Sequence, residues 1–156
     1  MAAVNTLKNL LNDDIRQLNE LADLLKTEKE KLAESDIAAL EPLTQQKNDL
    51  LGQIRERAKR KIHVLVEMGY RPNSGSPSRF IQSSGVEDLI KPWQAAEDAM
   101  TACHELNSVN HRVVTHVQKR LARLSDIFRG TSGQQKLYGA TGEQTSMNHR
   151  TILASA

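Results

Sequence analysis

The chain has 156 residues, of which 26% are charged and 38% hydrophobic, a composition typical of one folded, water-soluble domain. Aromatic residues make up only 3%, too few for an aromatic-lined catalytic pocket, and a formal charge of +2 gives little bulk attraction to nucleic acid. No apolar run reaches the roughly 18 residues of a membrane helix, and no signal-peptide pattern opens the chain, so we expect a cytoplasmic protein without membrane insertion.

The first predicted helix covers residues 4–33. Its apolar residues recur every three or four positions, as on one face of an α-helix: Val4, Leu7, Leu11, Leu18, Leu21, Leu25 and Leu32. Ser35 and Asp36 interrupt this pattern, and both residue types cap new helices by accepting backbone N–H bonds. Pro42 is tolerated only near a first helical turn or at a kink, so we expect the second helix to begin between Asp36 and Leu43.

The second predicted helix covers residues 37–68, with an apolar stripe from Leu40 to Leu65. Gly69 follows it, where a left-handed C-terminal cap is needed. Residues 70–85 are rich in Pro, Gly and Ser, which predicts a loop with at most one short turn, near Phe80 and Ile81.

The third predicted helix covers residues 86–129 and is the longest. One seam of residues runs along it in steps of three and four: Trp93, Ala96, Met100, Cys103, Asn107, Asn110, Val114, Val117, Leu121, Leu124 and Phe128. Such a face must be buried against other helices, so we expect an all-α, antiparallel bundle of three long helices with coiled-coil-like packing. The surplus length near residues 117–128 should protrude with its apolar surface partly uncovered.

The predicted bundle domain spans residues 1–130, and residues 131–156 form a polar tail that is flexible or folds on a partner. Within the seam, Asn107 and Asn110 are exceptions, because a buried amide costs free energy unless it is hydrogen-bonded. One polar residue in a helical core commonly sets register, so we expect register control, with a polar contact to a partner as the alternative.

Three features with possible chemical roles have simpler explanations. His104, His111 and His116 are separated by seven and five residues, whereas helical metal ligands usually lie three or four apart. The basic run of residues 55–61 is interrupted by Glu56 and contains no stacking aromatic residue, which favours a solvated helix face. The single cysteine, Cys103, lies on the seam as a small apolar group. No phosphate loop or nucleophile elbow is present, so we expect no enzyme, metal or cofactor.

The order and spacing of several residues resemble those of the FlgN family of bacterial flagellar export chaperones. The resemblance covers essentially the whole chain and rests on Lys47, Leu50, Leu51, Asn107, Asn110, Val113, Val114, Leu121, Leu124, Gly130, Leu137, Tyr138, Gly139 and Gly142.

This resemblance implies a chaperone for the hook-associated proteins FlgK and FlgL, which are exported unfolded by the flagellar type III secretion apparatus. It places client contact on Val117, Leu121, Leu124, Ile127 and Phe128. It also implies that Tyr138 docks on the export-gate protein FlhA. Neither ATP hydrolysis nor a metal ion is implied.

Two alternatives of other classes stay open. A structural coiled-coil adaptor would use the same seam for self-assembly alone, and a small helical nucleic-acid-binding protein would use the basic run of residues 55–61. An uncovered end of the third helix is compatible with a homodimer, and the sequence does not distinguish FlgK from FlgL as the preferred client.

Overall fold

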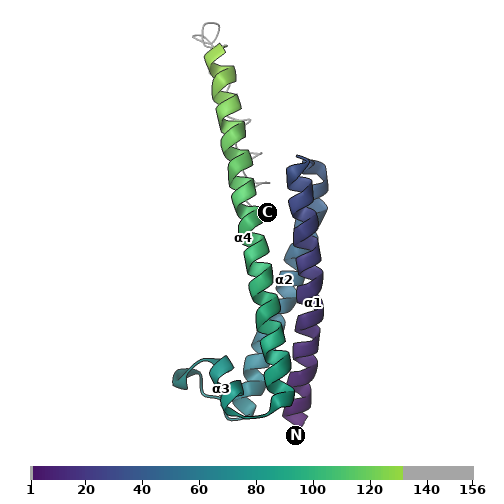
Figure 1. Cartoon of the computed structure of the whole chain (residues 1–156), viewed down its shortest axis with the longest axis vertical. Helices are drawn as coiled ribbons and strands as arrows, with labels where there is room; N and C mark the ends of the chain where they lie inside the picture. Colours follow the sequence, from purple (N-terminus) through teal and green to yellow (C-terminus); the bar gives the residue numbers. More distant parts are fainter. Residues whose placement is uncertain (1, 132–156) are drawn as a thin grey trace.

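The structure is a computed structural model that describes residues 2–131, and within this range it is all-helical. The elements are α1 (Ala2–Ala33), α2 (Ile37–Glu67), the 3₁₀ helix η1 (Pro72–Ser74), α3 (Pro77–Ser83) and α4 (Glu87–Thr131). The all-α class predicted from the sequence is therefore confirmed. Figure 1 shows α1 and α2 as a helical hairpin, with α4 beside it and α3 at the base.

α1 packs along both of the other long helices. Side-chain contacts advance together along α1 and α4, from Lys8 and Asp88 to Leu25 and Asn110, so these two helices run parallel. Contacts between α1 and α2 advance in opposite senses, from Asp14 with Lys61 to Glu28 with Lys47, so this pair is antiparallel.

The apolar core divides into three clusters along the helices. The basal cluster joins all four α-helices around buried leucines and isoleucine. A middle cluster is formed by Leu18, Leu21, Leu25, Ile54 and Cys103. At the tip of the hairpin only Leu32, Leu40 and Val114 form a buried cluster. The core therefore narrows along α4 and ends near Val114.

Local signals account for the two ends of α2. Asp36 caps its first turn, because the Asp36 carboxylate accepts a hydrogen bond from the backbone N–H of Ala39 at 3.2 Å. At the other end Gly69 has a φ of +105°, which a residue with a Cβ rarely adopts. The Tyr70 N–H then donates to the Leu65 carbonyl at 2.9 Å, the hydrogen bond of a Schellman cap.

The segment predicted to be a loop contains an additional helix. α3 begins after Ser76, whose hydroxyl accepts from the Arg79 N–H, and Pro77 occupies the first helical position, where proline is favoured. Ile81 of α3 is completely buried in the basal cluster. The prediction therefore underestimated the helical content of residues 70–85. Burial of Ile81 in the core stabilises a helix that is too short to be stable alone.

The base is further connected by polar contacts around Trp93. The indole N–H of Trp93 donates to the Ser78 hydroxyl at 3.0 Å and to the Glu97 carboxylate at 3.1 Å. The Lys61 ammonium lies 5.6 Å from the centre of the indole ring. α2, α3 and α4 are thereby joined at the end of the molecule opposite to the projecting part of α4.

Candidate functional site: the projecting end of α4

α4 is much longer than the hairpin against which it packs. It contains 45 residues, whereas α1 contains 32 and α2 contains 31. Because α1 and α4 run parallel from a common base, the surplus extends beyond the hairpin tip (Figure 1). We name residues 117–130 of α4 the overhang, and at 1.5 Å per residue it is about 21 Å long.

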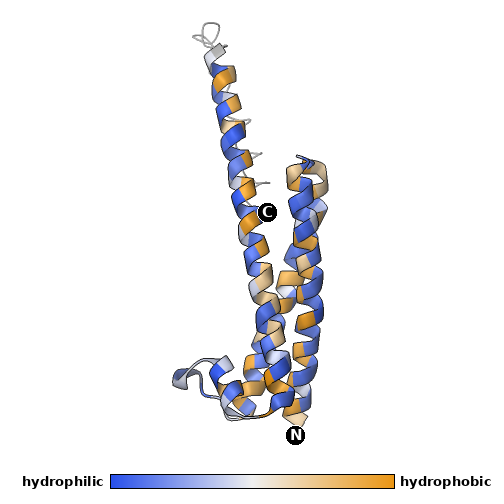
Figure 2. Ribbon diagram, viewed as in Figure 1, coloured by the Kyte–Doolittle hydropathy of each residue, from blue (hydrophilic) through white to orange (hydrophobic). Residues whose placement is uncertain are grey.

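The overhang continues the apolar seam without cover from α1 or α2. Val117 is half-buried, whereas every residue from 119 to 130 is exposed. Four large apolar side chains have high exposed fractions: Leu121 42%, Leu124 51%, Ile127 60% and Phe128 72%. Figure 2 shows hydrophobic residues recurring along this projecting part of the helix.

All five residues predicted to contact a client thus lie on the overhang. Leu121 lies four residues after Val117, and Leu124 three residues after Leu121, so these side chains share one helix face. An apolar stripe of this kind fits one face of another amphipathic helix. Nearer the base, seam residues such as Ala96, Cys103 and Val114 are buried, whereas Met100 is 45% exposed.

The two asparagines of the seam lie in different surroundings. Asn110 is only 1% exposed, and its amide nitrogen donates to the Leu25 carbonyl and to the Glu28 carboxylate, both at 2.8 Å. Asn107 is exposed. Register control therefore remains a prediction for Asn110. The place of Asn107 in the seam had suggested a core position, but this residue lies outside the core.

Asn110 belongs to a buried polar layer just below the hairpin tip. The Glu28 carboxylate that accepts its hydrogen bond also lies 3.6 Å from the Lys47 ammonium, and both charged side chains are almost completely buried. A buried carboxylate is costly unless a cation and hydrogen-bond donors accompany it. This layer joins α1, α2 and α4 immediately before the overhang begins.

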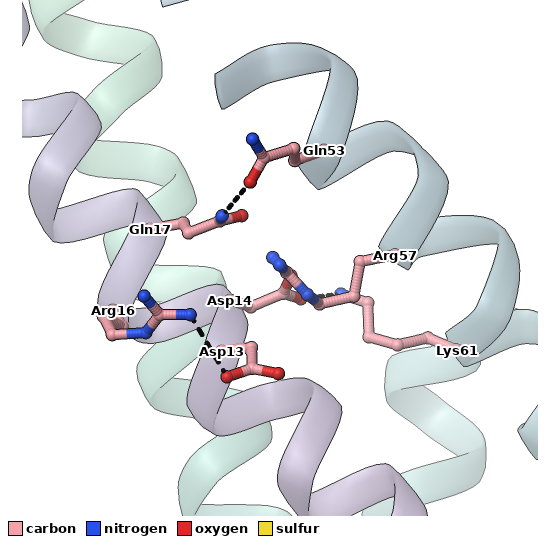
Figure 3. A network of polar contacts seen from close by, with 7 residues as sticks. All are labelled: Asp13, Asp14, Arg16, Gln17, Gln53, Arg57 and Lys61. Atoms are coloured by element: carbon pink, nitrogen blue, oxygen red, sulfur yellow. Dashed lines mark hydrogen bonds and ion pairs between the residues drawn. The ribbon is translucent and has the colours of Figure 1, made fainter. Parts of the chain in front are cut away.

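A second polar layer lies nearer the base and uses part of the basic run. Figure 3 shows Asp14 of α1 reached by Arg57 and Lys61 of α2. The Arg57 guanidinium donates to the Asp14 carboxylate at 3.0 Å, and Lys61 pairs with the same carboxylate, which is 1% exposed. Gln17 donates to Gln53 one turn further along α1. Arg57 and Lys61 therefore hold the two helices together.

The structure gives no geometry for metal chemistry in the part it describes. His104, His111 and His116 are all exposed. Within residues 2–131 no group of three His, Cys, Asp or Glu side chains is placed to hold a metal ion. Among the same residues no helix has the length and apolar content needed to cross a membrane.

Cys103 is buried in the middle cluster. Its thiol donates to the Leu18 carbonyl at 3.1 Å, and burial raises the pKa of the thiol. A protonated thiol in an apolar core is a poor nucleophile. Cys103 is therefore a packing residue of the α1–α4 interface.

Two predictions lie outside the described residues. They are the FlhA-docking role of Tyr138 and the proposed tail of residues 131–156, of which only the backbone of Thr131, the last residue of α4, is described.

The sequence reasoning overlooked the basic side chains of the overhang. Lys119, Arg120, Arg123 and Arg129 are all exposed, and Asp126 is the single acidic residue among them. The sequence feature that could have identified them is the change from mainly acidic residues before residue 112 to mainly basic residues after it, within one helix.

These features define an all-helical protein with an exposed apolar helix end, the geometry of a protein that binds amphipathic segments. The family model described as FlgN protein matches residues 1–146. The chain belongs to the FlgN family of flagellar chaperones. Membership implies a role as a flagellar export chaperone and binding to flagellar hook-associated proteins. The FlgN family is a family of chaperones and not of enzymes. Comparisons with curated proteins and with solved structures gave no match.

Proposed function

We propose that this protein is a cytoplasmic chaperone that holds the C-terminal helical segments of FlgK and FlgL on its overhang. It thereby prevents their premature assembly and delivers them to the flagellar type III secretion apparatus. The observation that carries the proposal is the run of exposed apolar residues from Leu121 onward, beyond the last buried seam residue, Val114. Membership of the FlgN family supports the chaperone role.

Covering an apolar stripe is the physical basis of the proposed activity. An amphipathic helix that has not yet found its partner in the assembled structure exposes apolar surface and tends to self-associate. Packed against the overhang, the same surface is removed from water in a helix–helix contact. The client is then kept from its final partners until it is released.

The expected affinity is modest. Leu121 and Leu124 are about half exposed, so burying the rest of each side chain supplies on the order of 1 kcal/mol. Association itself costs at least about 4 kcal/mol in lost translational and rotational freedom. The stripe therefore needs further contacts from the client, and the resulting complex is reversible, as handover to the export apparatus requires.

The scaffold we propose for this activity is an antiparallel three-helix bundle with coiled-coil-like packing, spanning residues 1–130. The buried layer of Glu28, Lys47 and Asn110 supports α4 just before it leaves the hairpin. A rigid base under the overhang lowers the entropy lost when the client binds.

For delivery we propose that Tyr138, on a tail of residues 131–156, docks on FlhA. The support is the family resemblance of the Leu137-Tyr138-Gly139 segment. A docking residue separate from the overhang would let the loaded chaperone reach the gate without first releasing its client.

The direct test replaces the two half-exposed leucines. Leu121→Asp with Leu124→Asp should lower the affinity for the C-terminal helix of FlgK at least tenfold by calorimetry, because charged groups would be buried in an apolar contact. The matched control is Ile62→Asp with Val66→Asp, which alters two exposed apolar residues of α2 and should leave affinity unchanged. Unchanged affinity in the Leu121→Asp and Leu124→Asp variant would mean that the overhang is not the binding surface.

A structural coiled coil is the competing use of the same seam. Light scattering separates the two functions, because a chaperone should gain one client's mass when FlgK is added. A self-assembling adaptor would have a multiple of the 17.4 kDa chain mass without client and would not respond to it. If a homodimer dissociates to accept client, the dimer mass should be replaced by the mass of one chain plus one client.

A further inference from the structure

α4 is divided into two halves of opposite charge. Residues 87–111 contain five acidic residues and one basic residue, a formal charge of −4. Residues 112–131 contain five basic residues and one acidic residue, a formal charge of +4. The acidic half packs on α1, and the basic half contains the overhang. The surplus of positive charge therefore coincides with the exposed apolar stripe.

Positive charge follows one edge of the stripe. Arg120 lies four residues before Leu124, and Arg123 lies four residues before Ile127, so each arginine neighbours an apolar residue on the helix surface. Lys119 and Arg123 are themselves four residues apart, a like-charge spacing that destabilises a helix slightly. The Lys119–Arg123 spacing is therefore slightly unfavourable for the overhang when no partner is bound.

Neither of two intramolecular explanations accounts for this pattern. Basic residues stabilise a helix at its C-terminus, but the effect fades beyond the last turn, which includes Arg129 and excludes Lys119, Arg120 and Arg123. Among the described residues no ion pair involves Lys119, Arg120, Arg123 or Arg129. α1 carries both signs interleaved, as solvated faces do. α2 has a basic run at residues 55–61, but there Arg57 and Lys61 pair with the buried Asp14 carboxylate and Lys59 pairs with Glu56.

We infer that the segment held on the overhang is an amphipathic helix whose apolar stripe is flanked by carboxylates. The inference rests on the proposed client-binding role of the overhang and specifies the chemistry of that client. Arg120 and Arg123 would pair with acidic residues beside the client's stripe, and guanidinium groups suit such pairs because they bind carboxylates in a bidentate manner. Charge complementarity would speed encounter and reject basic helices.

Two other occupants fit the surface less well. A second overhang carries the same positive charge, and the acidic half of another copy's α4 already packs its apolar residues, such as Ala96 and Cys103, against α1. The chain's own residues 132–156 contain Lys136 and Arg150 against the single acidic residue Glu143. Neither offers both an apolar stripe and a surplus of carboxylates.

The test uses two synthetic helical peptides with identical apolar positions, one with flanking Glu and one with flanking Lys. Fluorescence anisotropy with the full chain should give at least tenfold tighter binding of the Glu peptide at 50 mM salt, and this advantage should shrink at 500 mM because surface charges are screened. Arg120→Glu with Arg123→Glu should reverse the preference. Arg55→Glu with Arg60→Glu on α2, an equal change of charge at exposed positions, should leave it intact.

Each other outcome overturns the inference in an identifiable way. Equal binding of the two peptides at both salt concentrations, with loss of both on Leu121→Asp and Leu124→Asp, would refute the acidic client and leave the chaperone proposal standing. Binding of neither peptide, together with unchanged FlgK affinity in the leucine variant, would refute both. An RNA oligonucleotide that binds the overhang more tightly than the Glu peptide would identify a nucleic-acid site. A dimer that dissociates on Arg120→Glu and Arg123→Glu would identify a second copy as the occupant.

Discussion

The side-chain amide of Asn110 donates a hydrogen bond to the backbone carbonyl of Leu25 at 2.8 Å. This bond joins α4 to α1 near the last buried level of the bundle, where an apolar residue in place of Asn110 would allow neighbouring registers at lower cost. The overhang begins seven residues later. We expect this contact to fix the register of α4 on α1, and with it the position at which α4 leaves the hairpin.

Asn110→Ala should lower the free energy of unfolding by about 2 kcal/mol, because the variant loses two buried hydrogen bonds, one of them to a carboxylate. Asn107→Ala is the matched control and should change it by less than about 0.5 kcal/mol, since Asn107 is exposed. Urea unfolding followed by circular dichroism measures both. Equal destabilisation by the two variants would contradict the assignment of the polar core position to Asn110.

Lys47→Met should lower the free energy of unfolding by about 3 kcal/mol at neutral pH, because the buried Glu28 carboxylate would lose its cation. Combining it with Glu28→Leu should recover much of the loss, since no uncompensated charge then remains. Lys59→Met, which removes a cation from an exposed pair with Glu56, should cost less than about 0.5 kcal/mol. If the double variant were less stable than Lys47→Met alone, the desolvation argument would be wrong.

The Cys103 thiol should react with a disulfide reagent far more slowly in the native protein than in urea, because the thiol is buried and its pKa is raised. Its effect on stability has a definite sign. As pH rises above the ordinary thiol pKa of about 8.5, the unfolded chain loses this proton first, so stability falls. Cys103→Ala should therefore show a smaller loss of thermal stability between pH 7 and pH 9.5 than the parent protein. A larger loss in the variant would contradict the raised pKa.

Tyr138→Ala should leave the affinity for FlgK unchanged while lowering its secretion, since we propose that this side chain acts at the export gate. Calorimetry measures the first effect and immunoblotting of culture supernatant the second. Tyr138→Phe is a conservative control that retains the ring. A parallel loss of affinity and secretion in Tyr138→Ala would instead assign the tyrosine to client contact.

Periodicity alone predicted the long helices, because each apolar stripe extends over many turns. It could not find α3, where seven residues give less than two turns of pattern, although the Ser76-Pro77 pair is a recognisable helix start. It also could not separate Asn107 from Asn110. Both lie on the seam, and only the register of α4 against α1 decides which amide reaches the Leu25 carbonyl.

The extent of the overhang likewise depends on tertiary structure. The seam has the same spacing of three and four residues before and after Val114, so the pattern predicts an apolar face along the whole helix. Where that face loses its cover is set by the turn at residues 34–36, which ends the hairpin. Comparing helix lengths predicted a protruding end near residues 117–128, and its basic charge can be counted from the sequence. The structure adds that Lys119, Arg120 and Arg123 are exposed there.

Hydrogen–deuterium exchange tests the central claim most directly. When the C-terminal helix of FlgK is added to the full chain, amides in residues 117–130 should exchange at least tenfold more slowly, while those of the α1–α2 hairpin should change little. Slower exchange confined to α1 and α2, with unchanged exchange along the overhang, would contradict the claim that α4 extends beyond its own bundle to hold another protein's terminal helix.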